Sequence, residues 1–121
     1  MASSRQHRLY SYPACSTCRK AIAWLKERGI AAELFDITIQ PPGRPELREA
    51  LSQIGRSRLF NTSGQSYRAL GSARVKAMDD QQAVEALASD GRLIKRPFLI
   101  SADGRICTGF RPDEWEALLG C

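Results

Sequence analysis

The chain has 121 residues, of which 43% are hydrophobic and 26% charged, so its composition is that of a soluble globular protein and excludes a disordered one. Its 18 basic side chains outnumber the 13 acidic ones and give a net charge of +5. Fourteen of the basic residues are arginines, which suit forked contacts to carboxylates, phosphates and other oxyanions. They are spread along the whole chain, so charge alone does not indicate a nucleic-acid-binding protein.

The apolar segments of the chain are short. None is long enough to span a bilayer, and the first eight residues contain no apolar core of a signal peptide. We therefore expect a cytoplasmic protein without membrane insertion. Cytosolic thiols stay reduced, so a structural disulfide framework is not expected. The four cysteines to be explained are Cys15, Cys18, Cys107 and Cys121.

The first 37 residues predict a β-α-β unit. A short strand is expected over 8–12, and a helix over about 16–28 stops at Gly29. A second, buried strand is expected over 31–37, because this segment is dense in apolar and β-prone residues. Two strands joined by a helix imply a right-handed parallel crossover.

The middle of the chain, about 43–90, predicts a layer of helices. Pro45 suits the first turn of a helix. Short helical pieces and loops are expected over 55–80, and a clear helix over 81–89 follows them. This helical layer separates the β-α-β unit from the rest of the chain.

The last part predicts a hairpin and a final helix. Residues 98–100 form a strong strand pattern, and 105–107 pair back across a tight turn. The final helix opens at Pro112. The order β-α-β, helical insert, β-β-α is the thioredoxin arrangement with an added helical layer, so we expect residues 1–121 to form one α/β domain.

Cys15 and Cys18 are the strongest candidates for chemistry. Cys15 falls in the turn before the first helix, where free backbone N–H groups and the helix dipole favour a thiolate. Arg19 and Lys20 add positive charge nearby. Cys18 lies one turn further on, at a spacing that allows a disulfide. The pair predicts an attacking thiol at Cys15 and a resolving thiol at Cys18.

This C-x-x-C is also compatible with functions other than thiol exchange. Such a pair is often half of a zinc site, but His7 is the only histidine, and Cys107 and Cys121 form no second C-x-x-C, so no metal site is predicted. A purely structural pair stays open. A loop of the tyrosine-phosphatase kind needs an arginine six residues after its cysteine, where Ala21 stands.

A second group of residues precedes the strand at 98–100. In a thioredoxin fold, the proline that opens this strand is usually cis and lies against the C-x-x-C turn, so a cis bond is predicted at Pro97. Arg96 would then point at Cys15. Arg111 either converges on the same place or is a solvated surface side chain.

Four segments of the chain resemble the ArsC/Spx family, in the same order and across almost its whole length. They are Tyr12 to Ala21, Asn61 to Arg68, Lys95 to Leu99, and Gly109 to Pro112. The resemblance implies a thioredoxin-like core with a helical insert. The family contains glutaredoxin-dependent arsenate reductases, regulators of the Spx and MgsR type that bind RNA polymerase, and members of unassigned role.

The two branches differ at particular positions. For a reductase, the resemblance implies that the Cys15 thiolate attacks arsenate while Arg96 and Arg111 hold the oxyanion. A third arginine is usual there, and Asn61 stands at its position. The reductases also commonly carry serine where this chain has Cys18. The cysteine pair and the turn after Asn61 therefore look closer to the Spx/MgsR branch.

The first hypothesis is accordingly a redox-sensing regulator in which oxidation of the cysteine pair changes a surface read by the α subunit of RNA polymerase, with no direct contact to nucleic acid. The alternative is an arsenate reductase, or a related reductase of a small substrate, that depends on glutathione or glutaredoxin. Arg19, Arg96 and Arg111 are the candidates for binding the thiolate or an oxyanion. No cofactor beyond such a reductant is expected, and we expect a monomer.

The remaining candidates are expected to be peripheral. Cys107 should face away from the main core without serving the site, and Cys121 should be exposed. Arg56, Arg58 and Arg68 form either a solvated face or a partner-binding patch.

Overall fold

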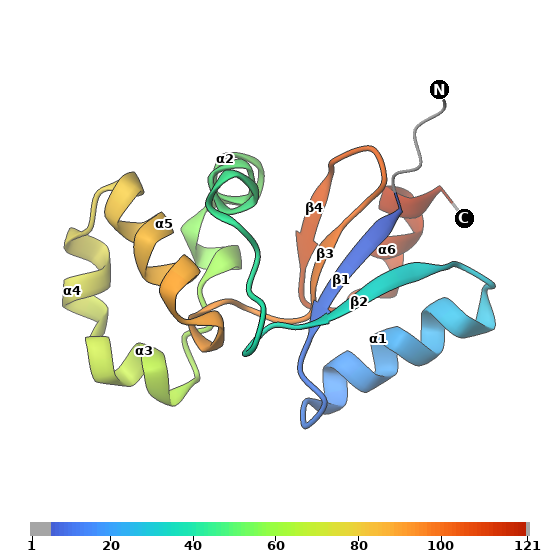
Figure 1. Ribbon diagram of the computed structural model, residues 1–121, viewed down its shortest axis with the longest axis horizontal. Helices are drawn as coiled ribbons and strands as arrows, with labels where there is room; N and C mark the ends of the chain where they lie inside the picture. Colours follow the sequence, from blue (N-terminus) through green and yellow to red (C-terminus); the bar gives the residue numbers. More distant parts are fainter. Residues whose placement is uncertain (1–5, 121) are drawn as a thin grey trace.

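A four-stranded sheet organises the computed structural model, which describes residues 6–120 (Figure 1). Its strands are β1 (His7–Ser11), β2 (Ala32–Asp36), β3 (Phe98–Ile100) and β4 (Ile106–Thr108), in the order β2-β1-β3-β4. β1 and β2 are parallel, as the predicted crossover requires, whereas β3 runs antiparallel to both β1 and β4. Cys121, predicted to be exposed, lies outside the described residues.

Helix α1 (Ser16–Glu27) connects β1 to β2. Cys18, Ala21, Trp24 and Leu25 are its buried residues, and their spacing places them on one face of a helix. The helix is followed by Gly29, whose φ of 67° lies in the left-handed region that favours glycine. The predicted helix is therefore confirmed to within one residue at its end.

Strand β2 is an edge strand, not the buried strand that the sequence predicts. It pairs only with β1, and Glu33 and Leu34 are exposed, Leu34 to 51%. Phe35 still stacks on Tyr10 of β1, with 4.7 Å between the ring centroids. A high content of apolar residues predicts a strand but does not show how many strands pair with it. The charged residues within β2 are typical of an exposed edge strand.

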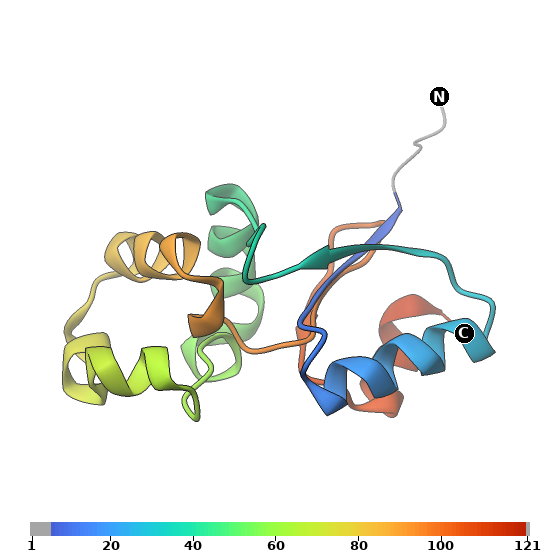
Figure 2. The ribbon, with the colours of Figure 1, turned by 60° about the horizontal axis from the view of Figure 1, so that its bottom comes forward.

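The chain segment that connects β2 to β3 is helical, and its helices lie apart from α1 (Figures 1 and 2). Gly55, with φ 78°, breaks the first of them. The fourth begins with a capping box in which Asp79 and Gln82 satisfy each other's backbone N–H groups. Within residues 6–120 no helix is both long and apolar enough to cross a bilayer. The elements are α2 (Arg44–Leu59), α3 (Gln65–Leu70), α4 (Ser72–Ala77), α5 (Asp80–Ser89) and the 3₁₀ turn η1 (Gly91–Leu93).

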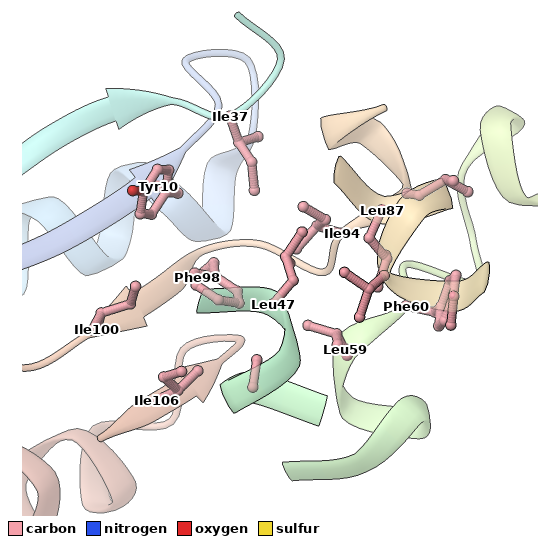
Figure 3. Packing of buried hydrophobic residues seen from close by; sticks show 14 of the residues in the cluster. Tyr10, Ile37, Leu47, Leu59, Phe60, Leu87, Ile94, Phe98, Ile100 and Ile106 are labelled. Atoms are coloured by element: carbon pink, nitrogen blue, oxygen red, sulfur yellow. The ribbon is translucent and has the colours of Figure 1, made fainter. Parts of the chain in front are cut away.

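Two hydrophobic clusters lie on opposite faces of the sheet, because successive strand residues point to opposite sides. The larger joins the sheet to the helical insert (Figure 3). The smaller lies under α1 and α6 (Pro112–Leu119), which share one side of the sheet in Figure 2. Cys107 belongs to this smaller cluster, so it faces away from the larger core and is nevertheless 95% buried, with 5% of its surface exposed.

Polar contacts also tie the insert to the sheet. The side-chain oxygen of Gln53 on α2 accepts a hydrogen bond from the backbone N–H of Ile106 at 2.8 Å. The Thr108 hydroxyl donates to the backbone oxygen of Arg58, whose guanidinium donates back to the backbone oxygen of Thr108 at 3.0 Å. These bonds fix the end of α2 against β4.

Candidate functional site

Cys15 is the residue that caps the amino end of α1. Its φ of −88° and ψ of 117° are extended, and its sulfur accepts a hydrogen bond from the backbone N–H of Cys18 at 3.4 Å. The Cys15 N–H donates to the backbone oxygen of Tyr12 at 2.9 Å, which closes the turn between β1 and the helix. The thiol therefore occupies the place where a Ser or Asp side chain commonly satisfies free helix N–H groups.

Cys18 lies one turn further along the helix and points inward. Only 1% of its surface is exposed, whereas Cys15 is partly exposed. The backbone N–H of Tyr12 donates to the Cys18 sulfur at 3.4 Å. Tyr12 thus contacts both cysteines through its own backbone, and the two thiols are free in this structure.

The environments of the two thiols move their pKa values in opposite directions. Burial by itself would raise the pKa of Cys15, but hydrogen bonds from Cys18 and Thr17, together with the charge of Arg96, lower it below the ordinary 9.0. Burial raises the pKa of Cys18 to about 12, against the lowering effect of its Tyr12 hydrogen bond. At neutral pH Cys15 is the better nucleophile, and Cys18 stays protonated.

Arg96 lies beside the pair on the segment that leads into β3. Its guanidinium carbon is 5.0 Å from the centre of the Tyr12 ring. Its charge helps to lower the pKa of Cys15, and at Cys18 it acts in the same direction but is outweighed by burial. The Arg96–Pro97 peptide bond is cis, the conformation predicted for it. The backbone oxygen of Pro97 accepts a hydrogen bond from Gly109 at 2.9 Å, which fixes this segment against the end of β4.

Arg19 and Arg111 have other partners in this structure. The Arg19 guanidinium donates to the backbone oxygen of Pro13 at 2.8 Å and so braces the turn before Cys15. Arg111 is 70% exposed and lies 3.4 Å from a carboxylate oxygen of Glu114. Within the described part of the chain, no hydrogen bond joins either guanidinium to Cys15, and their role at a thiolate or oxyanion stays a prediction.

Cys107 forms a separate group with Glu114 and Arg58. Its sulfur lies 3.5 Å from a carboxylate oxygen of Glu114, which is held by Arg58 at 2.9 Å. Burial raises the Cys107 pKa to about 11, and the hydrogen bond to Glu114 acts in the same direction. Its burial and raised pKa both disfavour the thiolate form at neutral pH.

Two of the three insert arginines singled out in the sequence have acidic partners within the protein. Arg58 pairs with Glu114, and Arg56 lies 3.0 Å from Asp80. Arg68 donates to the backbone oxygen of Ser63 at 3.1 Å. Of the two expectations for these three residues, a basic patch for a partner is the less favoured, because two of the charges are already balanced.

A cleft of about 490 Å³ is lined by Tyr12 and Arg96, two neighbours of the cysteine pair, but not by the cysteines themselves. It also contains an arginine that the sequence did not single out. Arg92, on η1, lines this cleft next to Asn61, whose side chain donates to the backbone oxygen of Arg92 at 3.4 Å. Only the fold brings the two residues together, so no local motif marks Arg92. The lining residues are Tyr12, Asn61, Gly64, Gln65, Ser66, Ala69, Arg92 and Arg96.

Alkylation with iodoacetamide, followed by mass spectrometry of each cysteine peptide across a pH series, tests the assigned environments. Cys15 should react far faster at neutral pH than Cys18 or Cys107, with a titration midpoint below 9.0, because only its thiolate is stabilised. Arg96→Gln should move that midpoint upward, since it removes a positive charge. A Cys15 midpoint at or above 9.0 would contradict this account.

Among residues 6–120, no three His, Cys, Asp or Glu side chains gather where they could hold a metal ion.

Comparisons with known proteins agree on one family. Residues 10–118 match the model of the ArsC family. The uncharacterized protein YusI of Bacillus subtilis is 41% identical over 88% of this chain and 92% of its own length. The global transcriptional regulator Spx of Listeria innocua is 30% identical over 92% of this chain and 85% of its own length.

A solved structure gives the same result for the fold. The crystal structure of a possible arsenate reductase from Streptococcus mutans is 37% identical in sequence, covers 93% of this chain and 99% of its own, and superposes with a TM-score of 0.84. The match spans the sheet and the helical insert together. The chain belongs to the ArsC family and has its thioredoxin-like fold.

Proposed function

We propose that this protein carries out thiol–disulfide exchange, with Cys15 as the attacking thiolate and Cys18 as the resolving thiol. The observation that carries the proposal is the contrast between two sulfurs in one helical turn. The Cys15 sulfur accepts a hydrogen bond from a backbone N–H, and the residue is partly exposed. Cys18, in contrast, is only 1% exposed and has a pKa of about 12. Cys15 is therefore the thiol suited to attack a substrate first, and Cys18 is suited to react with Cys15 in a second step.

The exchange proceeds in two steps. The Cys15 thiolate attacks one sulfur of a disulfide, forms a mixed disulfide with it and releases the other half as a thiolate, which takes a proton from water. Cys18 then loses its proton and attacks the Cys15 sulfur, which closes a Cys15–Cys18 disulfide and releases the second thiolate. The substrate gains two electrons and the protein loses two, and two external thiols reverse the change.

Arg96 serves this chemistry at both stages. Its charge stabilises Cys15 as a thiolate before attack, and again as the leaving group when the Cys15–Cys18 disulfide is reduced. Cys15 is partly exposed, and Arg96 also lines a cleft of about 490 Å³, the size of a site for a small substrate. The geometry thus favours a reductase of a small substrate, with glutathione or glutaredoxin as the external reductant.

A redox-sensing regulator is the second candidate, and the similarity to Spx favours it. In that case the same disulfide changes a surface read by a protein partner, for which the α subunit of RNA polymerase is the first choice. The exchange chemistry of the cysteine pair is common to both candidates, so the difference lies in what reacts with the pair and what reads it.

Two assays separate the candidates. Turnover is measured with arsenate, glutathione and glutaredoxin, and stoichiometric oxidation of the reduced protein is measured with bis(2-hydroxyethyl) disulfide. Binding to the purified α subunit is measured for the reduced and the oxidised protein. A reductase should turn over substrate without redox-dependent binding, and a regulator should show the reverse. A reduced protein that neither reacts with the disulfide nor turns over arsenate would contradict thiol exchange itself.

A further inference from the structure

The cleft beside the cysteine pair carries two arginines without an acidic partner. Arg92 is exposed and Arg96 half-buried, and neither forms a salt bridge with any acidic side chain of residues 6–120. Arg44, Arg56 and Arg58 are each held by a carboxylate within 3.0 Å. Other arginines of residues 6–120, Arg74 among them, also lack an ion pair, and what distinguishes Arg92 and Arg96 is that both line one cleft. Two positive charges on one concave surface therefore lack an internal counter-charge, which is what a site for an anion requires.

Tyr12 connects this cleft to the sulfurs. Its ring lies 5.0 Å from the guanidinium carbon of Arg96 on the cleft side, while its backbone bonds to Cys15 and Cys18. Two residues that line the cleft, Tyr12 and Arg96, are therefore also the ones that bond to the cysteines or act on their charge. The cleft, about 490 Å³, has the size of a pocket for a small molecule.

Asn61 holds Arg92 in place. The backbone N–H of Asn61 donates to the backbone oxygen of Leu93 at 2.7 Å, and the Asn61 side chain donates to the backbone oxygen of Arg92. Gly64 permits this packing, because a Cβ there would lie 2.8 Å from the amide nitrogen of Asn61. Neutral Asn61 thus holds the backbone of η1 at the wall of the cleft, and the neighbouring Arg92 supplies a positive charge there from a different part of the chain.

We propose that Arg92 and Arg96 bind the carboxylates of a small thiol compound whose sulfur forms the mixed disulfide with Cys15. The proposal rests on the thiol–disulfide exchange proposed above. Guanidinium groups form forked hydrogen bonds with carboxylates, and the amide and hydroxyl groups of Asn61, Gln65 and Ser66 line the same cleft and suit the polar parts of a peptide-like thiol. In the exchange written above, the half of the disulfide retained on Cys15 carries these carboxylates.

The test compares a charged with a neutral disulfide. Rate constants for reduced protein are measured with oxidised glutathione and with bis(2-hydroxyethyl) disulfide. Arg92→Gln should slow the reaction with oxidised glutathione about tenfold and that with the neutral disulfide less than about twofold, since it removes one charge-assisted contact. Arg92→Lys should restore part of the rate. Arg74→Gln, the same change at an exposed position on α4, is the matched control and should leave both rates unchanged.

Binding of the unreactive S-methylglutathione gives a readout independent of exchange. Arg92→Gln should weaken its affinity about tenfold, whereas Arg74→Gln should not, and raised salt should reduce the difference. If the neutral disulfide reacts and Arg92→Gln leaves both the oxidised glutathione rate and this affinity unchanged, the anion site is wrong and the exchange stands. If neither disulfide reacts, the proposed function fails, and equal affinities of wild type and Arg92→Gln would then overturn the anion site as well.

Discussion

Cys15→Ser is expected to lower the rate of thiol–disulfide exchange about a thousandfold or more, because a serine hydroxyl at the same place is no nucleophile at neutral pH. The cap of α1 should survive the change, since a serine oxygen also accepts the hydrogen bond from the Cys18 N–H. The loss should therefore be one of chemistry and not of folding. Circular dichroism and urea unfolding of the variant check this point.

Two further variants make the assignment of roles specific. Cys18→Ser should still attack a disulfide but should stop at a mixed disulfide on Cys15, which intact-protein mass spectrometry detects. Cys107→Ser should exchange at the wild-type rate, because the Cys107 thiol is buried and hydrogen-bonded to Glu114 and takes no part in the reaction. Full activity of Cys15→Ser would contradict the assignment of Cys15 as the attacking thiol. A mixed disulfide that accumulates on Cys18 of this variant would show that the two roles are reversed.

Gly91→Ala is expected to destabilise the fold by about 3 kcal/mol, or to prevent folding. A Cβ at this position would lie 1.8 Å from the backbone oxygen of Ile37 and 2.8 Å from its carbonyl carbon. Ile37 is fully buried, and its N–H is bonded to Ser11 at 2.8 Å, so this backbone cannot move aside cheaply. The close approach joins η1, which carries Arg92 next to Gly91, to the segment that follows β2.

Gly43→Ala is the matched control for this prediction. A Cβ there would lie 2.7 Å from a carboxylate oxygen of Glu46, which is the tip of a flexible side chain and can turn away. Its cost should stay below about 1 kcal/mol, that of a weaker helix cap. Urea unfolding of both variants measures the difference, and equal stabilities would show that Gly91 tolerates a side chain.

Local patterns predict most of the helices and strands. The first helix, the helix capped by Asp79 and the final helix at Pro112 have start signals and apolar faces within a few residues. The exposure of Leu34 could not be predicted, because strand order depends on pairing between distant segments. The burial of Cys107 under Trp115 has the same long-range origin.

Some residues of the candidate site can likewise be predicted from local sequence, and others depend on long-range packing. Cys15, Cys18 and the cis bond at Pro97 follow from short motifs and the order of elements. Arg92 does not, since its relation to the site depends on packing between η1 and the turn at Asn61. The Arg58–Glu114 pair joins residues 56 positions apart, and it uses a charge that the sequence left open for a partner.

Mapping the disulfide formed under mild oxidation tests the central claim most directly. The reduced protein is treated with diamide, blocked with an alkylating agent and digested without reduction. We expect a peptide containing a Cys15–Cys18 disulfide that dithiothreitol reverses, with Cys107 still a free thiol. Recovery of Cys15 and Cys18 as free thiols after diamide treatment would contradict the thiol-exchange centre.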